Sequence, residues 1–166
     1  MNSFEAASIE ITMELLNNAV LTWGLIACVL AQLSKIVFEL IQNRQFRPSI
    51  FFETGGMPSS HSALITGTAS GIGLKVGFDD PLFALAATVA FVVMYDASGV
   101  RRAAGLTSAK VNELVDQGSS SISGKPLKET LGHTRVEVLV GSLFGPAIAL
   151  PGITFIGSPI DLFHLI

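Results

Sequence analysis

Four stretches of this sequence carry no formal charge, and their lengths constrain the fold more than any other feature. They cover residues 15–34, 62–74, 81–95 and 138–160. A helix needs about 20 mostly apolar residues to cross the roughly 30 Å hydrocarbon core of a bilayer. The first and last stretches reach that length, and the middle two reach it only if a neighbouring titratable residue is drawn into the span or its edge. We therefore expect an all-α, multi-pass transmembrane bundle of about four to five helices.

The overall composition agrees with a membrane protein. Charged residues make up 14% of the chain, against roughly 25% in soluble proteins, and the mean hydropathy is +0.58. The alternative is a soluble helical core, because apolar runs of ten to fourteen residues are often buried core helices. The four uncharged runs together leave little of the 166 residues for a polar exterior, which favours the membrane interpretation.

We expect one membrane domain that covers residues 1–166. A polar N-terminal segment over residues 1–14 precedes four candidate membrane helices, at residues 15–41, 59–78, 81–100 and 134–164. Prolines interrupt the last candidate, which is therefore either one broken helix or two.

Residues 101–133 form the longest predicted loop. Apolar residues at helical spacing predict a short surface helix over residues 108–117. Pro126 predicts the first turn of a further helix that begins near Lys125.

Basic residues alternate between the predicted loops. The N-terminal segment has none, the first loop has Arg44 and Arg47, the second has Asp79 and Asp80, and the third has six basic residues. Because cytoplasmic loops are enriched in lysine and arginine, the first and third loops should face the cytoplasm, or the stroma in a plastid.

A histidine stands at the start of the second candidate helix, in Met57-Pro58-Ser59-Ser60-His61. Ser59 or Ser60 can cap this helix, and the free amides of a helix N-terminus favour an anion. A histidine there can donate a proton to the group that leaves the anion. The alternative is a capped helix start whose histidine only touches the membrane interface.

His133 and Glu137 are four residues apart, which places both on one face of a helix. A carboxylate bonded to one ring nitrogen fixes the tautomer and leaves the other nitrogen free to attack. The alternative is an ordinary surface pair that contributes a few tenths of a kcal/mol.

Cationic side chains near these histidines could bind a phosphate group. Arg101 and Arg102 follow the third apolar stretch, and guanidinium groups bind phosphate oxygens in a bidentate manner. The alternative role for either arginine is a membrane anchor. Asp96 lies in the same helix and needs a cationic or histidine partner at that depth. Lys35 either pairs with Glu39 at the membrane edge or reaches the anion pocket.

The segments GGMPSSHSAL, MYDASGVRRAAG and LGHTRVEVLVG together resemble the phosphatidic acid phosphatase type 2 (PAP2) superfamily, which shares its helical fold with vanadium haloperoxidases. They are similar to its divergent branch of small bacterial, cyanobacterial and plastid membrane proteins over residues 20–150. The resemblance implies an integral protein of a bacterial or cyanobacterial plasma membrane, or of a plastid membrane.

The resemblance also implies a mechanism. His133 becomes transiently phosphorylated, Glu137 orients it, and His61 protonates the leaving alcohol. Phosphate-binding roles fall to the remaining basic or polar candidates, which are Arg101, Arg102, Lys35, Ser60, Lys128 and Arg47. Asp96 is a structural partner.

Three departures from the family motifs are visible. Eleven residues separate Lys35 from Arg47, where the first motif has six. Pro126 and Leu127 occupy the serine and arginine positions of the third motif, so another cation would have to replace that arginine. Glutamate stands at position 137 where the third motif ends in aspartate.

The leading hypothesis is a membrane-embedded phosphatase that hydrolyses a lipid phosphate or an isoprenoid diphosphate at the cytoplasmic or stromal face. The alternative is a catalytically inactive PAP2-like protein that binds an anionic headgroup or acts as a scaffold. Vanadate-dependent halide oxidation is a third hypothesis, which multiple membrane spans disfavour. We expect no metal, cofactor or nucleic-acid partner. Small residues over positions 67–73 permit close helix packing. The sequence is therefore also compatible with a homo-oligomer.

Overall fold

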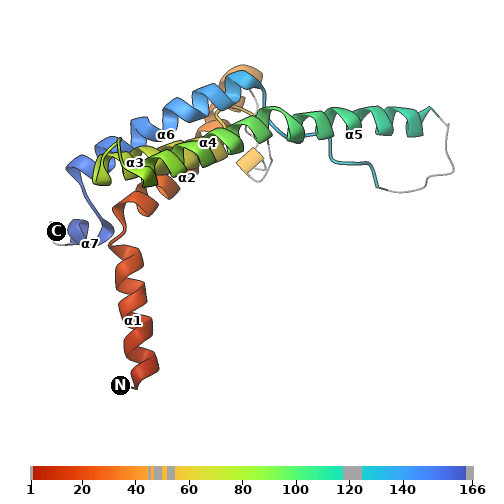
Figure 1. Ribbon diagram of the computed structural model, residues 1–166. Coiled ribbons are helices and arrows are strands. Elements are labelled where there is room, and N and C mark those ends of the chain that lie inside the picture. Colours follow the sequence, from red (N-terminus) through yellow and green to blue (C-terminus); the bar gives the residue numbers. More distant parts are fainter. Residues whose placement is uncertain (1, 45, 47–49, 52–54, 118–124, 164–166) are drawn as a thin grey trace.

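The computed structural model describes residues 2–44, 46, 50–51, 55–117 and 125–163. Regular structure in these residues is helical, with no strand, so the predicted all-α fold is confirmed (Figure 1). The helices are α1 (Ser3–Leu16), α2 (Ala19–Asn43), α3 (Ser60–Val76), α4 (Pro81–Ser98), α5 (Val100–Asp116), α6 (Arg135–Phe155) and α7 (Pro159–Phe163).

Four of these helices form the membrane bundle, with α3 packed against α2, α4 and α6. Three segments of the described chain are long and apolar enough to cross a bilayer, at Ala19–Ile41, Pro81–Asp116 and Arg135–Phe155. The shorter α3 is rich in glycine, alanine and serine, and seven of its residues are buried. Small side chains allow its neighbours to approach closely, which is how helices associate in membranes. The predicted multi-pass helix bundle is confirmed.

Small residues four positions apart on α3 face residues four positions apart on α6. Each of the following pairs is in close contact, or would be if the glycine carried a Cβ atom: Ser59 with Gly141, Ala63 with Gly145, Gly67 with Ala149, and Gly71 with Ile153. The constant offset between partners means that the two helices run parallel. Their N-termini therefore lie at the same end of the bundle, although 75 positions separate Ser60 from Arg135 in the sequence.

The same packing bears on self-association. Gly67, Gly71 and Gly73 lie in the small-residue stretch over positions 67–73, and all three are buried within the chain. Gly67 and Gly71 contact α6, and Gly73 contacts Phe78 and Phe83. The glycines of this stretch therefore serve intramolecular packing.

The C-terminal apolar run forms two helices. Helix α6 continues through Pro146 and Pro151 and ends at Phe155, and α7 begins at Pro159. Membrane helices tolerate internal prolines when neighbouring helices compensate for the lost hydrogen bonds. The connection is fixed to α2, because Trp23 Nε1 donates to the Gly157 carbonyl oxygen at 2.9 Å.

The polar N-terminal segment is also helical. Helix α1 begins with a capping box, in which Asn2 Oδ1 accepts from the Glu5 amide and Glu5 Oε2 accepts from the Asn2 amide. It runs at a steep angle to the bundle axis (Figure 1). Two of the polar residues of this segment, Asn2 and Glu5, therefore cap the helix.

The loop over residues 101–133 differs from its prediction in two ways. The helix expected over residues 108–117 begins earlier, and α5 continues from α4 beyond the end of the bundle (Figure 1). The prediction of a helix that begins near Lys125 is wrong, because residues 125–132 are not helical. The Asn112 side chain instead accepts from the Leu127 amide and donates to its carbonyl oxygen, both at 2.9 Å. These bonds hold the segment alongside α5.

Candidate functional site

Three segments that are distant in the sequence meet around one small cavity at an end of the bundle. His61 comes from the first turn of α3, Arg101 from the start of α5, and His133 from the turn before α6. The cavity has a volume of about 40 Å³, and Val93, Ala97 and Gly132 complete its lining. The parallel packing of α3 and α6 brings the two histidines together, and the length of α4 places Arg101 beside them.

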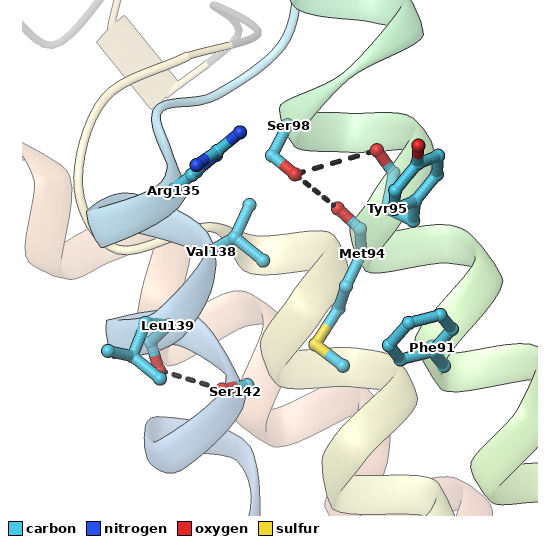
Figure 2. Close-up of a pocket in the computed structure, with 8 residues that line it drawn as sticks. All are labelled: Phe91, Met94, Tyr95, Ser98, Arg135, Val138, Leu139 and Ser142. Carbon is cyan, nitrogen blue, oxygen red and sulfur yellow. Dashed lines mark hydrogen bonds between the residues drawn. The ribbon is translucent and has the colours of Figure 1, made fainter.

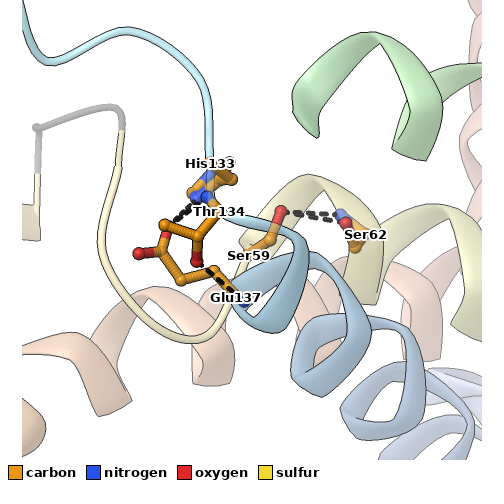
Figure 3. Close-up of polar contacts among 5 residues, drawn as sticks. All are labelled: Ser59, Ser62, His133, Thr134 and Glu137. Carbon is orange, nitrogen blue, oxygen red and sulfur yellow. Dashed lines mark hydrogen bonds and ion pairs between the residues drawn. The ribbon is translucent and has the colours of Figure 1, made fainter. Parts of the chain in front are cut away.

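His133 is held rigidly in this position. Its side chain is 6% exposed, and its backbone amide donates to the Ala97 carbonyl oxygen at 2.9 Å. The Nδ1 atom lies 2.9 Å from Glu137 Oε2 (Figure 3). Because an ionised carboxylate only accepts hydrogen bonds, Nδ1 is the donor. The Nε2 atom is then the ring nitrogen that could react, provided that it carries no proton.

Gly132 allows the turn before His133. Its φ is +76°, which favours glycine, and a Cβ atom would lie 2.7 Å from the Arg101 carbonyl carbon. The backbone of α5 therefore packs directly against the turn that carries His133.

Glu137 has a second role as part of the cap of α6. The Thr134 hydroxyl accepts from the Glu137 amide at 3.2 Å, and Glu137 Oε2 accepts from the Thr134 amide at 3.2 Å. The same carboxylate oxygen therefore bonds the helix cap and the His133 ring (Figure 3). Sequence reasoning did not identify Thr134, although the Thr134-x-x-Glu137 spacing is that of a capping box.

The environment of His133 favours the neutral ring. Burial lowers the pKa of His133 from its ordinary value of 6.5, and the positive charge of Lys35 lowers it further. Hydrogen bonds to Glu137 and to the Gly56 backbone, together with the negative charge of Glu137, raise the pKa and oppose this shift. The net result is a pKa below 6.5, so the imidazole is mostly neutral at pH 7.

Helix α3 begins at the cavity, and its cap is Ser59. The Ser59 hydroxyl accepts from the Ser62 amide at 3.3 Å and from the Ser62 hydroxyl at 2.9 Å (Figure 3). Its own amide donates to the Glu137 carbonyl oxygen at 3.1 Å, which ties the start of α3 to the first turn of α6. Ser60 is buried and does not line the cavity.

The two adjacent arginines differ in their surroundings. Arg101 Nε donates to Asp96 Oδ2 at 2.6 Å, so Arg101 is the cationic partner that Asp96 was expected to need. Both side chains are exposed, the Arg101 side chain by 61%, but only Arg101 lines the cavity. The Asp96 carboxylate therefore orients one guanidinium group beside the two histidines.

The remaining basic candidates that the structure describes do not line the cavity. Lys35 is 2% exposed, and its charge acts on Glu137, His133 and His61 from within the bundle. Lys128 is exposed in the segment beside α5. Arg47 lies outside the described residues. Within the described part of the chain, no three His, Cys, Asp or Glu side chains are grouped as a metal site would require.

Comparison with known proteins gives two matches. A sequence model of the divergent PAP2 family matches residues 16–148. The "uncharacterized membrane protein YuiD" of Bacillus subtilis (strain 168) is 39% identical over 151 residues, which cover 83% of this chain and 96% of the relative. No solved structure matches the chain.

Proposed function

The chain belongs to the divergent PAP2 family of membrane proteins, and on this basis we propose that it is a phosphatase for a lipid phosphate or isoprenoid diphosphate. The observation that carries the proposal is the shared cavity lined by His61, Arg101 and His133. His133 supplies the nucleophile, His61 the general acid and Arg101 the cation. Phosphoryl transfer through histidine requires these three groups.

The reaction proceeds in two steps. The neutral Nε2 atom of His133 attacks phosphorus, the bond between phosphorus and the leaving oxygen breaks, and His61 transfers its proton to that oxygen. Glu137 stabilises the positive charge on the phosphorylated ring through Nδ1. Water then attacks phosphorus with His61 as the base, which releases inorganic phosphate and regenerates His133. Arg101 and the free amides at the start of α3 stabilise the phosphate oxygens throughout.

A catalytically inactive, headgroup-binding or scaffolding protein is the second candidate. Two observations favour it. Pro126 and Leu127 replace the serine and arginine of the third motif, and Arg101 already pairs with Asp96. Such a protein would bind phosphate-bearing lipids without releasing phosphate, and the assays below separate the two candidates.

The charge distribution supports a cytoplasmic or stromal location for the cavity. The segments that carry Arg44, Arg101, Arg102, Lys110 and Lys128 all connect bundle helices at the cavity end. Basic residues in short loops are retained on the cytoplasmic side. The substrate would therefore come from the inner leaflet.

We expect Arg101→Gln to lower kcat/KM for phosphate release by about 100-fold or more, because it removes a preorganised cation from the transferring group. Arg102→Gln should lower it less, since Arg102 does not line the cavity. Lys110→Gln, a charge-matched control on α5, should leave it unchanged. Phosphate release from phosphatidate by purified protein in detergent micelles measures all three. Equal losses for Arg101→Gln and Arg102→Gln would contradict the assignment of Arg101.

The pH dependence follows from the lowered pKa of His133. Only the neutral His133 ring can attack and only a protonated His61 can act as the acid, so kcat/KM should have a bell-shaped pH profile whose acid limb follows a pKa below 6.5. Lys35 lowers that pKa, so Lys35→Met should move the acid limb to higher pH. The profile is measured as kcat/KM for phosphatidate between pH 4 and 8 in both proteins. An acid limb above 6.5 in the wild type, or no shift in the variant, would contradict the nucleophilic role of a neutral His133.

A further inference from the structure

A second cavity lies between α4 and α6, on the side of the bundle (Figure 2). Its volume is about 270 Å³, close to the roughly 300 Å³ at which small-molecule sites begin. It shares no lining residue with the cavity of His61 and His133. Helix α4 separates the two, because Val93 and Ala97 line the histidine cavity and Met94 and Ser98 line this groove.

The walls of the groove are suited to a hydrocarbon chain. Phe91 and Tyr95 stack on α4 with ring centroids 6.3 Å apart, and Val138 and Leu139 face them from α6. Both helices lie within segments that are apolar enough to cross a bilayer, so the groove opens toward lipid. Met94 lies between the two walls (Figure 2), and its flexible side chain can adapt to a bound chain.

One end of the groove carries a positive charge. Arg135, the first residue of α6, lies there beside Ser98, and Phe91 lies toward the other end (Figure 2). The Ser98 hydroxyl is already bonded to the Met94 carbonyl oxygen at 3.0 Å. No ion pair within the described residues involves the Arg135 guanidinium group. An unpaired guanidinium at the membrane edge of an apolar groove complements a phosphodiester with an attached acyl chain.

We propose that the groove between α4 and α6 binds an anionic phospholipid, with one acyl chain between Tyr95 and Leu139 and its phosphate on Arg135. This lipid is distinct from the substrate of the histidine cavity, because the two sites share no residue. The site therefore stands whether or not the protein is a phosphatase.

Native mass spectrometry of the purified full-length protein tests this site. The probes are phosphatidylglycerol and phosphatidylcholine with the same acyl chains, titrated from mixed micelles. The wild type should bind phosphatidylglycerol more tightly. Arg135→Gln should weaken phosphatidylglycerol binding about fivefold and leave phosphatidylcholine binding unchanged, since one cation near an anionic headgroup contributes about that much. Leu139→Trp, which fills the groove, should weaken the binding of both lipids.

Two further variants make the test specific. Lys110→Gln removes one positive charge from α5, away from the groove, and should not change lipid binding. His133→Ala should also retain phosphatidylglycerol binding. Two results would contradict the proposed groove site. One is that Arg135→Gln binds phosphatidylglycerol as tightly as the wild type does, and the other is that Lys110→Gln loses as much affinity for it as Arg135→Gln does. If His133→Ala abolishes binding, the lipid occupies the catalytic cavity instead.

Discussion

Replacing His133 with alanine should reduce the kcat for phosphate release from phosphatidate by at least about 10⁴-fold, to the background rate. Removal of a nucleophile in a cooperating set costs that much or more, because the remaining groups cannot carry the reaction through a covalent intermediate. In the proposed mechanism Glu137 acts through the His133 ring and His61 protonates the group that His133 displaces, so neither can replace the lost nucleophile. Phosphate release by equal amounts of purified wild type and variant, measured under single-turnover and steady-state conditions, tests the expectation.

The phosphorylated intermediate gives an independent readout. Rapid acid-free quenching of the wild type with ³²P-labelled phosphatidate should trap label on histidine, and His133→Ala should trap none. Glu137→Asp should retain part of the labelling, because aspartate keeps a carboxylate that can accept from Nδ1. Equal turnover by wild type and His133→Ala would end the catalytic assignment and favour a headgroup-binding protein. A matching thermal unfolding midpoint for the two proteins controls for folding.

Gly145→Ala should strongly destabilise the protein. A Cβ atom at this position would meet the Ala63 carbonyl oxygen and lie 2.7 Å from the Gly67 backbone nitrogen. Backbone atoms of a packed helix cannot rotate away, so α3 and α6 must separate. Overpacking of this kind costs about 1–3 kcal/mol and occasionally more. Unfolding of the purified protein by SDS titration, followed by circular dichroism, measures the loss.

The control for this prediction lies two residues further along α6. Ala147 is exposed on the lipid-facing side of the helix, so Ala147→Val adds volume without meeting another helix and should change the unfolding midpoint little. Gly145→Ala should also lower phosphatase activity, because the same contact aligns His61 with His133. A Gly145→Ala protein as stable as the wild type would show that α3 and α6 do not pack through these backbone contacts.

The sequence predicted the architecture well, for a simple physical reason. A bilayer imposes a minimum length and a low charge density on each spanning helix, and both are visible in residues 15–34 and 138–160. Prediction from hydropathy is less informative for a helix that is buried by other helices and not by lipid. Hydropathy could not identify α3 as the central helix, since what distinguishes it is the small size of Gly67 and Gly71 at a four-residue spacing.

Part of the candidate site could be predicted from the sequence, because some of its residues are close along the chain. His133 and Glu137 are close in sequence, and the contact expected from their spacing is present at 2.9 Å. The expected helical placement of His133 is wrong, because α6 begins at Arg135 and the cap at Thr134, not a shared helix face, brings the two side chains together. Local reasoning failed between Lys125 and Leu131, where Pro126 indicated a helix start. Tertiary hydrogen bonds from Asn112 override that tendency and hold the segment against α5.

What the sequence determined by itself was therefore the set of long membrane helices and the pairing of His133 with Glu137, because each depends on residues within a few turns of one another. Only the tertiary structure decided which cation joins the two histidines. Arg101 and Arg102 are adjacent, chemically identical and both exposed, and the contact of Gly132 with the start of α5, together with the Asp96 carboxylate, places only Arg101 at the cavity.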